Sequence, residues 1–105
     1  MEKYQVRADR TGCDLVWAND TSFGNSVQLS TTTGLIYGYG ADPNVLTADA
    51  FYLTATDWVT GDEVFRVYAG NDIPFNPVLG QMHLSPDGDA YIGSLRGLIR
   101  FADLP

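Results

Sequence analysis

The sequence predicts an all-β protein, and three observations support this class. No window shows the period of about 3.6 residues that an amphipathic helix requires. Short runs rich in valine, isoleucine, tyrosine and phenylalanine recur along the chain instead. Turn-forming pairs such as Thr60-Gly61 and Asp87-Gly88 separate these runs, which is typical of strands joined by hairpins.

Nine strands are expected, each a run of strand-forming residues bounded by turn residues. Their ranges are Tyr4–Asp9, Asp14–Asn19, Ser26–Ser30, Leu35–Gly40, Phe51–Trp58, Glu63–Ala69, Gln81–Ser85, Ala90–Leu95 and Leu98–Asp103. The fourth and sixth strands contain nearly continuous apolar residues, at positions 35–37 and 64–68. We therefore expect these two strands to be buried on both faces.

Tight turns are predicted where a glycine ends a short polar segment. Asp9 and Asp57 each precede a Thr-Gly pair, and an aspartate carboxylate can accept the backbone N–H two residues on. The glycines of these pairs, Gly12 and Gly61, are expected in the left-handed conformation. Gly88 is expected in the same conformation, because it ends a Ser-Pro-Asp-Gly turn.

Two stretches of the chain resemble each other at a spacing of about 50 residues. Residues 9–17 align with residues 57–65, and this alignment makes Trp17 and Phe65 nearly equivalent. The pairs Leu29-Ser30 and Leu84-Ser85 recur at a similar spacing. A repeat of this length with four strands in each unit is typical of a propeller blade.

At these residues the chain resembles the repeat of quinoprotein (PQQ)-type β-propellers. Residues 51–57 form the strand of that repeat that ends in Ala-x-Asp, and residues 60–66 form its Thr-Gly turn and a strand with an aromatic residue. Residues 84–93 are similar to the next two strands of such a blade. The resemblance covers nearly the whole chain and extends to the C-terminal blades of larger, uncharacterised bacterial propeller proteins.

The resemblance implies about two four-stranded antiparallel propeller blades, a partial β-propeller closing by oligomerisation. Residues 1–25 would supply the outer strands C and D of one blade, residues 26–77 a complete blade, and residues 78–105 strands A to C of a further blade. About two blades cannot close a ring, which typically needs four to eight. Either the N-terminal strands of one copy complete the last blade of the next, or the chain is a piece of a longer propeller protein. A small two-sheet sandwich is the alternative fold.

Composition excludes several classes of partner. The formal net charge of -7 disfavours nucleic acid and anionic membranes. The single cysteine, Cys13, cannot close an intrachain disulfide. The sequence shows no signal peptide and no apolar run of about 20 residues. We expect a cytoplasmic protein as given, while a secreted location remains open for longer relatives.

No motif predicts catalytic residues, a metal site or a cofactor. His83 lies in the predicted innermost strand and is a candidate to face a central channel, with a structural role as the alternative. Cys13 is expected to be an inert thiol. Asp87 and Asp89 are expected to build a turn rather than a calcium site. The aromatic residues Trp17, Trp58 and Phe65 are expected to pack between blades.

Three longer connections carry the candidate binding residues. In a propeller, the connections between blades and those between strands B and C emerge on one face, and loops held by a rigid scaffold are typical binding elements. The candidates are Asp20, Phe23, Asn25, Asp42, Asn44, Asp72, Phe75 and Asn76. Ordinary polar loops are the alternative interpretation.

The leading hypothesis is a non-catalytic propeller module that acts as a scaffold or as a ligand- or protein-binding surface. Its partner would be a second copy of itself or the rest of a longer propeller chain. The alternative is a fragment of a quinoprotein-like dehydrogenase. The adjacent-cysteine pair of that family is absent, and no residue can be matched to a quinone or calcium ligand.

Overall fold

A computed structural model describes residues 1–41, 50–77 and 80–102, and within these residues the chain forms nine strands in three antiparallel sheets. The first sheet pairs β1 (Glu2–Val6) with β2 (Cys13–Ala18). The second has the order β3 (Gln28–Ser30), β4 (Leu35–Ala41), β5 (Ala50–Asp57) and β6 (Glu63–Asn71). The third has the order β7 (Met82–Leu84), β8 (Ala90–Ser94) and β9 (Gly97–Phe101), and the short 3-10 helix η1 (Ile73–Phe75) precedes it.

The all-β prediction is confirmed, and each expected strand has a counterpart. The largest difference is at β1, which begins at Glu2 and ends at Val6 rather than at Asp9. The strand ends early because the next residue already belongs to the turn: the Arg7 N–H donates to the carbonyl oxygen of Gly12 at 2.9 Å. The sheets of the described residues do not close into a propeller ring.

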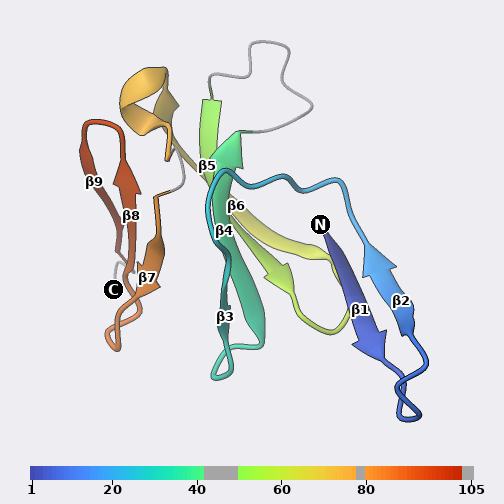
Figure 1. Cartoon of the computed structure of the whole chain (residues 1–105). Helices are drawn as coiled ribbons and strands as arrows, with labels where there is room; N and C mark the ends of the chain where they lie inside the picture. Colours follow the sequence, from blue (N-terminus) through green and yellow to red (C-terminus); the bar gives the residue numbers. More distant parts are fainter. Residues whose placement is uncertain (42–49, 78–79, 103–105) are drawn as a thin grey trace.

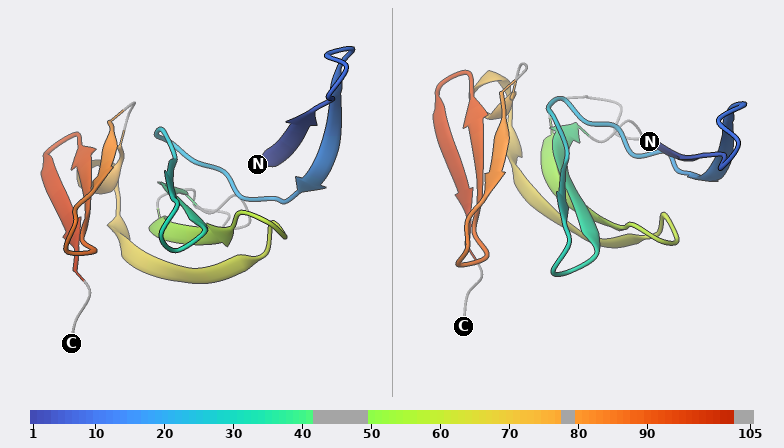
Figure 2. Two further views of the ribbon diagram at one scale, coloured as in Figure 1. Left: turned by 90° about the horizontal axis from the view of Figure 1, so that it is seen from below. Right: turned by 60° about the horizontal axis from the view of Figure 1, so that its bottom comes forward.

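The three sheets stand side by side in chain order, with the first and third on opposite sides of the second (Figure 1). Figure 2 shows the β1–β2 hairpin splayed away from the four-stranded sheet. Within each sheet, every strand pairs with the next one along the chain. The longest regular ladder joins β4 to β5, from Leu35 opposite Asp57 to Ala41 opposite Phe51.

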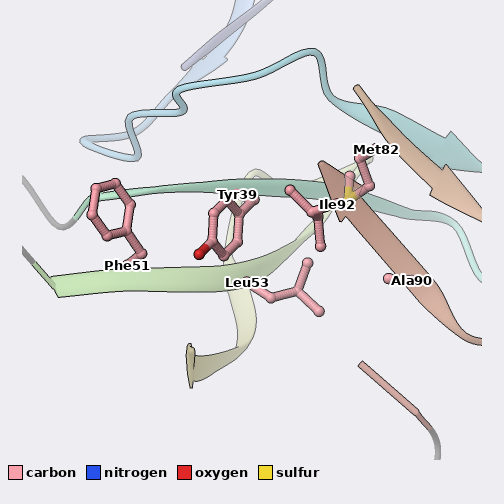
Figure 3. Close-up of a cluster of buried hydrophobic side chains, with 6 residues drawn as sticks. All are labelled: Tyr39, Phe51, Leu53, Met82, Ala90 and Ile92. Carbon is pink, nitrogen blue, oxygen red and sulfur yellow. The ribbon is translucent and has the colours of Figure 1, made fainter. Parts of the chain in front are cut away.

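The hydrophobic core lies between the second and third sheets (Figure 3). Tyr39 and Leu53 from the four-stranded sheet meet Met82 and Ile92 from the three-stranded sheet. All four are 4% exposed or less, and burying a side chain of this size contributes about 1.5–3 kcal/mol. The Tyr39 hydroxyl donates to the carbonyl oxygen of Phe75 at 2.7 Å, and burial raises the pKa of Tyr39 to about 12.

The strand β6 does not have the burial that its sequence predicts. Val64 and Tyr68 are each more than half exposed, and Phe65 is 39% exposed. The prediction of burial on both faces is therefore wrong for this strand in the single chain. The reason is positional, because β6 is the outer strand of its sheet and no described neighbour covers it fully.

Two of the three turn predictions for glycine are confirmed. Gly61 and Gly88 have φ angles of 79° and 90°. The prediction for Gly12 is wrong, because Arg10 holds the left-handed position of that turn with φ 60°. Both hairpins close over the same chain length, by bonds from Arg7 N–H to Gly12 and from Asp57 N–H to Asp62. The closing bonds make Arg7 the counterpart of Asp57, whereas the sequence alignment pairs Asp9 with Asp57. The alignment is therefore shifted by two residues from the structural match.

Both turn aspartates bond the backbone as predicted. The Asp9 Oδ1 accepts the Thr11 N–H at 3.0 Å, and the Asp57 Oδ1 accepts the N–H groups of Val59 and Thr60 at 2.8 and 2.9 Å. The Thr60 and Val59 bonds hold the pKa of Asp57 below its ordinary value. Each carboxylate therefore stabilises its hairpin in the ionised form.

Gly61 and Gly34 form a matched pair for measuring strain at a left-handed residue. Their φ angles are 79° and 70°, but an added Cβ at Gly61 would lie 2.5 Å from the Trp17 indole, whereas one at Gly34 would meet nothing within 4 Å. We expect Gly34→Ala to lower the free energy of unfolding by about 1 kcal/mol from backbone strain alone. Gly61→Ala is expected to cost at least twice as much in denaturant titrations. Equal losses for the two variants would contradict the contact with Trp17.

The Asp57 turn predicts a defined pH dependence of stability. A carboxylate with a lowered pKa in the folded state stabilises the fold above the ordinary value, 3.8, and this contribution is lost as pH falls through the folded value. We expect Asp57→Ala to be less stable than the native chain at pH 6. The gap should shrink steadily below about pH 4 when thermal unfolding is followed by circular dichroism. A gap that stays constant down to pH 2.5 would show that the ionised carboxylate does not stabilise this turn.

Candidate functional site

The two described connections between sheets lie at the same end of the molecule, the upper end in Figure 1. The β2–β3 connection carries Asp20, Phe23 and Asn25. The β6–β7 connection carries Asp72, Phe75 and Asn76. The predicted binding residues Asp42 and Asn44 lie outside the described residues.

Phe23 and Asn25 fasten the β2–β3 connection to β4. The ring of Phe23 lies against Gly38, in the space that a Cβ there would occupy. The Asn25 Oδ1 accepts the Tyr39 N–H at 3.2 Å, and the Gly24 N–H donates to the Tyr39 carbonyl at 3.0 Å. These bonds continue the edge pairing of β4 beyond Tyr37, where its pairing with β3 ends. Both candidate residues therefore hold the β2–β3 connection against β4.

Phe75 performs the same task for the β6–β7 connection. Its ring lies against Gly70 of β6, again where a Cβ would be, and its carbonyl accepts the Tyr39 hydroxyl. Asn76 is half-buried, and its carbonyl oxygen accepts the Leu95 N–H at 3.0 Å. Asp72 is exposed and holds an unusual backbone conformation, with φ 71° and ψ -178°.

Three candidates at this end retain side-chain polar groups that the described part of the fold does not use. The Asp20 side chain is exposed, as is that of Asp72. The Asn25 Nδ2 is buried without a hydrogen-bond partner among the described residues. An unpaired buried donor of this kind costs about 1–3 kcal/mol.

His83 is exposed and lies on β7, opposite Tyr91. The strand β7 is an edge of the third sheet. Within residues 1–41, 50–77 and 80–102, no three His, Cys, Asp or Glu side chains come together as metal ligands would. The channel position predicted for His83 stays a prediction.

The remaining candidates occupy turns and a strand start. Cys13 is exposed at the first residue of β2. The Asp89 carboxylate is almost buried and accepts bonds from Arg100 Nε at 2.8 Å and Nη2 at 2.6 Å. Asp89 also raises the pKa of Arg100. This ion pair ties β9 to the Ser85–Asp89 turn, so Asp89 fits the turn role better than a calcium site.

Trp17 and Trp58 pack between the first and second sheets. The Trp17 Nε1–H donates to the carbonyl oxygen of Trp58 at 3.0 Å, and Trp17 is 9% exposed. The Lys3 ammonium lies 4.0 Å from the centre of the Trp58 ring and donates to the same carbonyl at 2.9 Å. Asn19 strengthens this contact by donating from Nδ2 to the Gly61 carbonyl at 3.0 Å.

A groove separates β6 from the third sheet, and the sequence analysis did not find it. Its volume is about 410 Å³, and its lining includes Phe65 and Val67 from β6 and Leu84, Ala90 and Phe101 from the third sheet. We call it the β6–β9 groove. The apolar residues at alternate positions of β6 were a signal for an apolar face, but only the sheet packing shows that this face is open.

Comparison with known proteins adds no family to this description. A scan against protein-family models finds no match, and no curated protein matches the sequence significantly. In the described part of the chain, no helix has the length and apolar character needed to cross a bilayer.

The contact between Phe23 and Gly38 predicts non-additive energetics. Phe23→Ala should lower the free energy of unfolding by about 2 kcal/mol, because the ring is partly buried. Gly38→Ala should be strongly destabilising alone, since its Cβ would overlap the ring, but much less so in the Phe23→Ala background. Chemical denaturation of the four chains of this cycle measures the coupling. The exposed Asp20→Ala variant serves as a control, with an expected change within about 0.5 kcal/mol.

Proposed function

We propose that the protein is a non-catalytic β-propeller module that serves as a scaffold and binding surface and assembles with copies of itself. The three antiparallel sheets are then successive blades. Their stacking in chain order and the consecutive strand order within each sheet support this interpretation.

The observation that carries the proposal is the large apolar surface of the single chain. The solvent-accessible surface is 6856 Å², whereas a folded monomer of this mass exposes about 5,800 Å². The radius of gyration is 14.7 Å, compared with about 13 Å for a compact domain of this length. Eight of the fifteen exposed large apolar side chains in the described part of the chain lie on the β1–β2 hairpin and on β6, four on each.

Apolar surface of this kind marks an interaction site more often than a free face. Such side chains on strands with unpaired edges are suited to sheet-to-sheet and edge-to-edge contacts, rather than to a small polar substrate. The proposal therefore places the main binding activity on the sheets. Asp20 and Asp72 provide a smaller polar surface at the end of the molecule. The dehydrogenase alternative stays a prediction that no observed contact favours.

The mass of the chain in solution tests this function. We expect light scattering after gel filtration to give a multiple of the 11.5 kDa chain mass at micromolar concentration. Assembly should strengthen with added salt, because copies with net charge -7 repel each other and salt screens this repulsion. A mass of one chain at all concentrations up to about 100-fold higher would reject self-assembly as the function of the apolar faces.

A further inference from the structure

We propose that β6 is a self-association edge: the β6 strands of two copies pair antiparallel about a two-fold axis at Val67, which joins their four-stranded sheets into one continuous sheet. This inference rests on the proposed self-assembly and names the strand that makes the contact. The contact joins identical surfaces of the two copies, so it closes at a dimer.

The strand β6 offers a long edge at the outside of the four-stranded sheet. It is the longest of the described strands, with nine residues, and among the described residues it pairs with β5 alone. Figure 2 shows it along the outside of this sheet. Proline and lysine, which commonly protect an exposed edge from pairing, are absent from β6. Its outer side therefore presents an edge to which a further strand can add.

Apolar side chains are exposed on both faces of this edge. On the face toward the third sheet, Phe65 and Val67 are 39% and 43% exposed. Tyr68 lies on the opposite face, because successive side chains alternate along a strand, and it is 54% exposed. A small molecule in the β6–β9 groove would cover only the first face. An added strand would cover part of both faces, since its own side chains alternate in the same way.

The charged residues of β6 are placed so that the strand can pair with a second copy of itself. In an antiparallel pair of identical strands one residue lies opposite itself, and Val67 is the middle residue of the nine, so this centre overlaps the strands along their whole length. Arg66 then lies opposite the partner's Tyr68, and Glu63 lies opposite the partner's Asn71. No like charges meet. A centre at Arg66 would instead place two guanidinium groups opposite each other, which is destabilising.

A contact between Arg66 and a tyrosine ring already exists within one chain. The guanidinium carbon of Arg66 lies 5.6 Å from the centre of the Tyr52 ring on β5, the neighbouring strand. Its Nη2 also pairs with the Glu63 carboxylate at 2.7 Å, so the two charges of β6 balance each other within the strand. The partner's Tyr68 would give the guanidinium a second aromatic neighbour on the open side of β6.

The central pairs of the proposed contact use the regular part of β6. The ladder between β5 and β6 shifts register at two places, and between them Phe65–Tyr68 pair without interruption with Tyr52–Ala55. The pair of Val67 with itself and the two pairs of Arg66 with Tyr68 all fall in this segment. The local bends that the irregularities introduce therefore lie outside the central pairs.

Disulfide crosslinking tests this register. In a Cys13→Ser background, which removes the single native thiol, Val67→Cys places two thiols opposite each other with Cβ atoms about 5 Å apart. Val64→Cys is the matched control, because Val64 lies on the same strand and is 53% exposed, but its two copies would lie about 20 Å apart. We expect V67C to form a disulfide-linked dimer at least tenfold faster than V64C, as measured on non-reducing gels in a glutathione buffer.

A charge at the two-fold axis gives an independent measurement. Val67→Asp places two carboxylates directly opposite each other, so this variant should self-associate at least tenfold more weakly than the native chain. Val59→Asp makes the same change of charge in the β5–β6 turn, where the side chain is 71% exposed, and should associate like the native chain. Analytical ultracentrifugation measures all three chains.

Thermal unfolding establishes that each variant is folded. V67C introduces no charge, so the crosslinking experiment decides the question even if V67D does not fold. Crosslinking of V67C no faster than that of V64C, while the native chain assembles, would overturn the β6 pairing and leave the proposed self-assembly intact. A monomeric native chain would overturn both.

Discussion

Tyr39 lies at the point where the connections and the sheets are joined. Its ring is fully buried, stacks on Phe51 at 6.0 Å and meets Phe101 of the third sheet at 6.2 Å. Its backbone binds the β2–β3 connection through Gly24 and Asn25, and its hydroxyl binds the β6–β7 connection. One residue of β4 thus holds both of the connections that join the four-stranded sheet to its neighbours. A phenylalanine here would keep the packing but lose the hydrogen bond to the Phe75 carbonyl oxygen.

Three glycines allow aromatic side chains to pack directly against the backbone of the four-stranded sheet and its turn. Gly38, Gly70 and Gly61 each face an aromatic ring in the space where a Cβ would be. Two of these rings, Phe23 and Phe75, come from the connections themselves, and the third, Trp17, comes from the first sheet. The same geometry explains why aromatic residues on these connections are anchors.

The described part of the molecule combines one hydrophobic core with many exposed apolar side chains. One core between the second and third sheets buries the large side chains, whereas the hairpin and β6 keep theirs exposed. A sheet has two faces, and a chain with three sheets in a row leaves the outer faces uncovered. The proposed binding through these faces rests on this exposed apolar surface. The polar groups at the end of the sheets are a secondary feature by comparison.

The sequence by itself determined the local structure. The alternation of apolar runs with Asp, Gly and Pro placed nine strands, because strand propensity and turn chemistry act over a few residues. It also predicted the bonds of Asp9 and Asp57, which span only two residues. The left-handed residue of the first turn was predicted wrongly, because Arg10 adopts this conformation instead of Gly12. A local sequence pattern shows that a turn is present but not which of its residues is left-handed. The roles of Phe23, Asn25 and Phe75, the ion pair of Asp89 and the exposure of β6 were decided by tertiary structure alone. Most of these features depend on contacts that reach beyond a single turn, such as Asn25 with Tyr39 and Asp89 with Arg100.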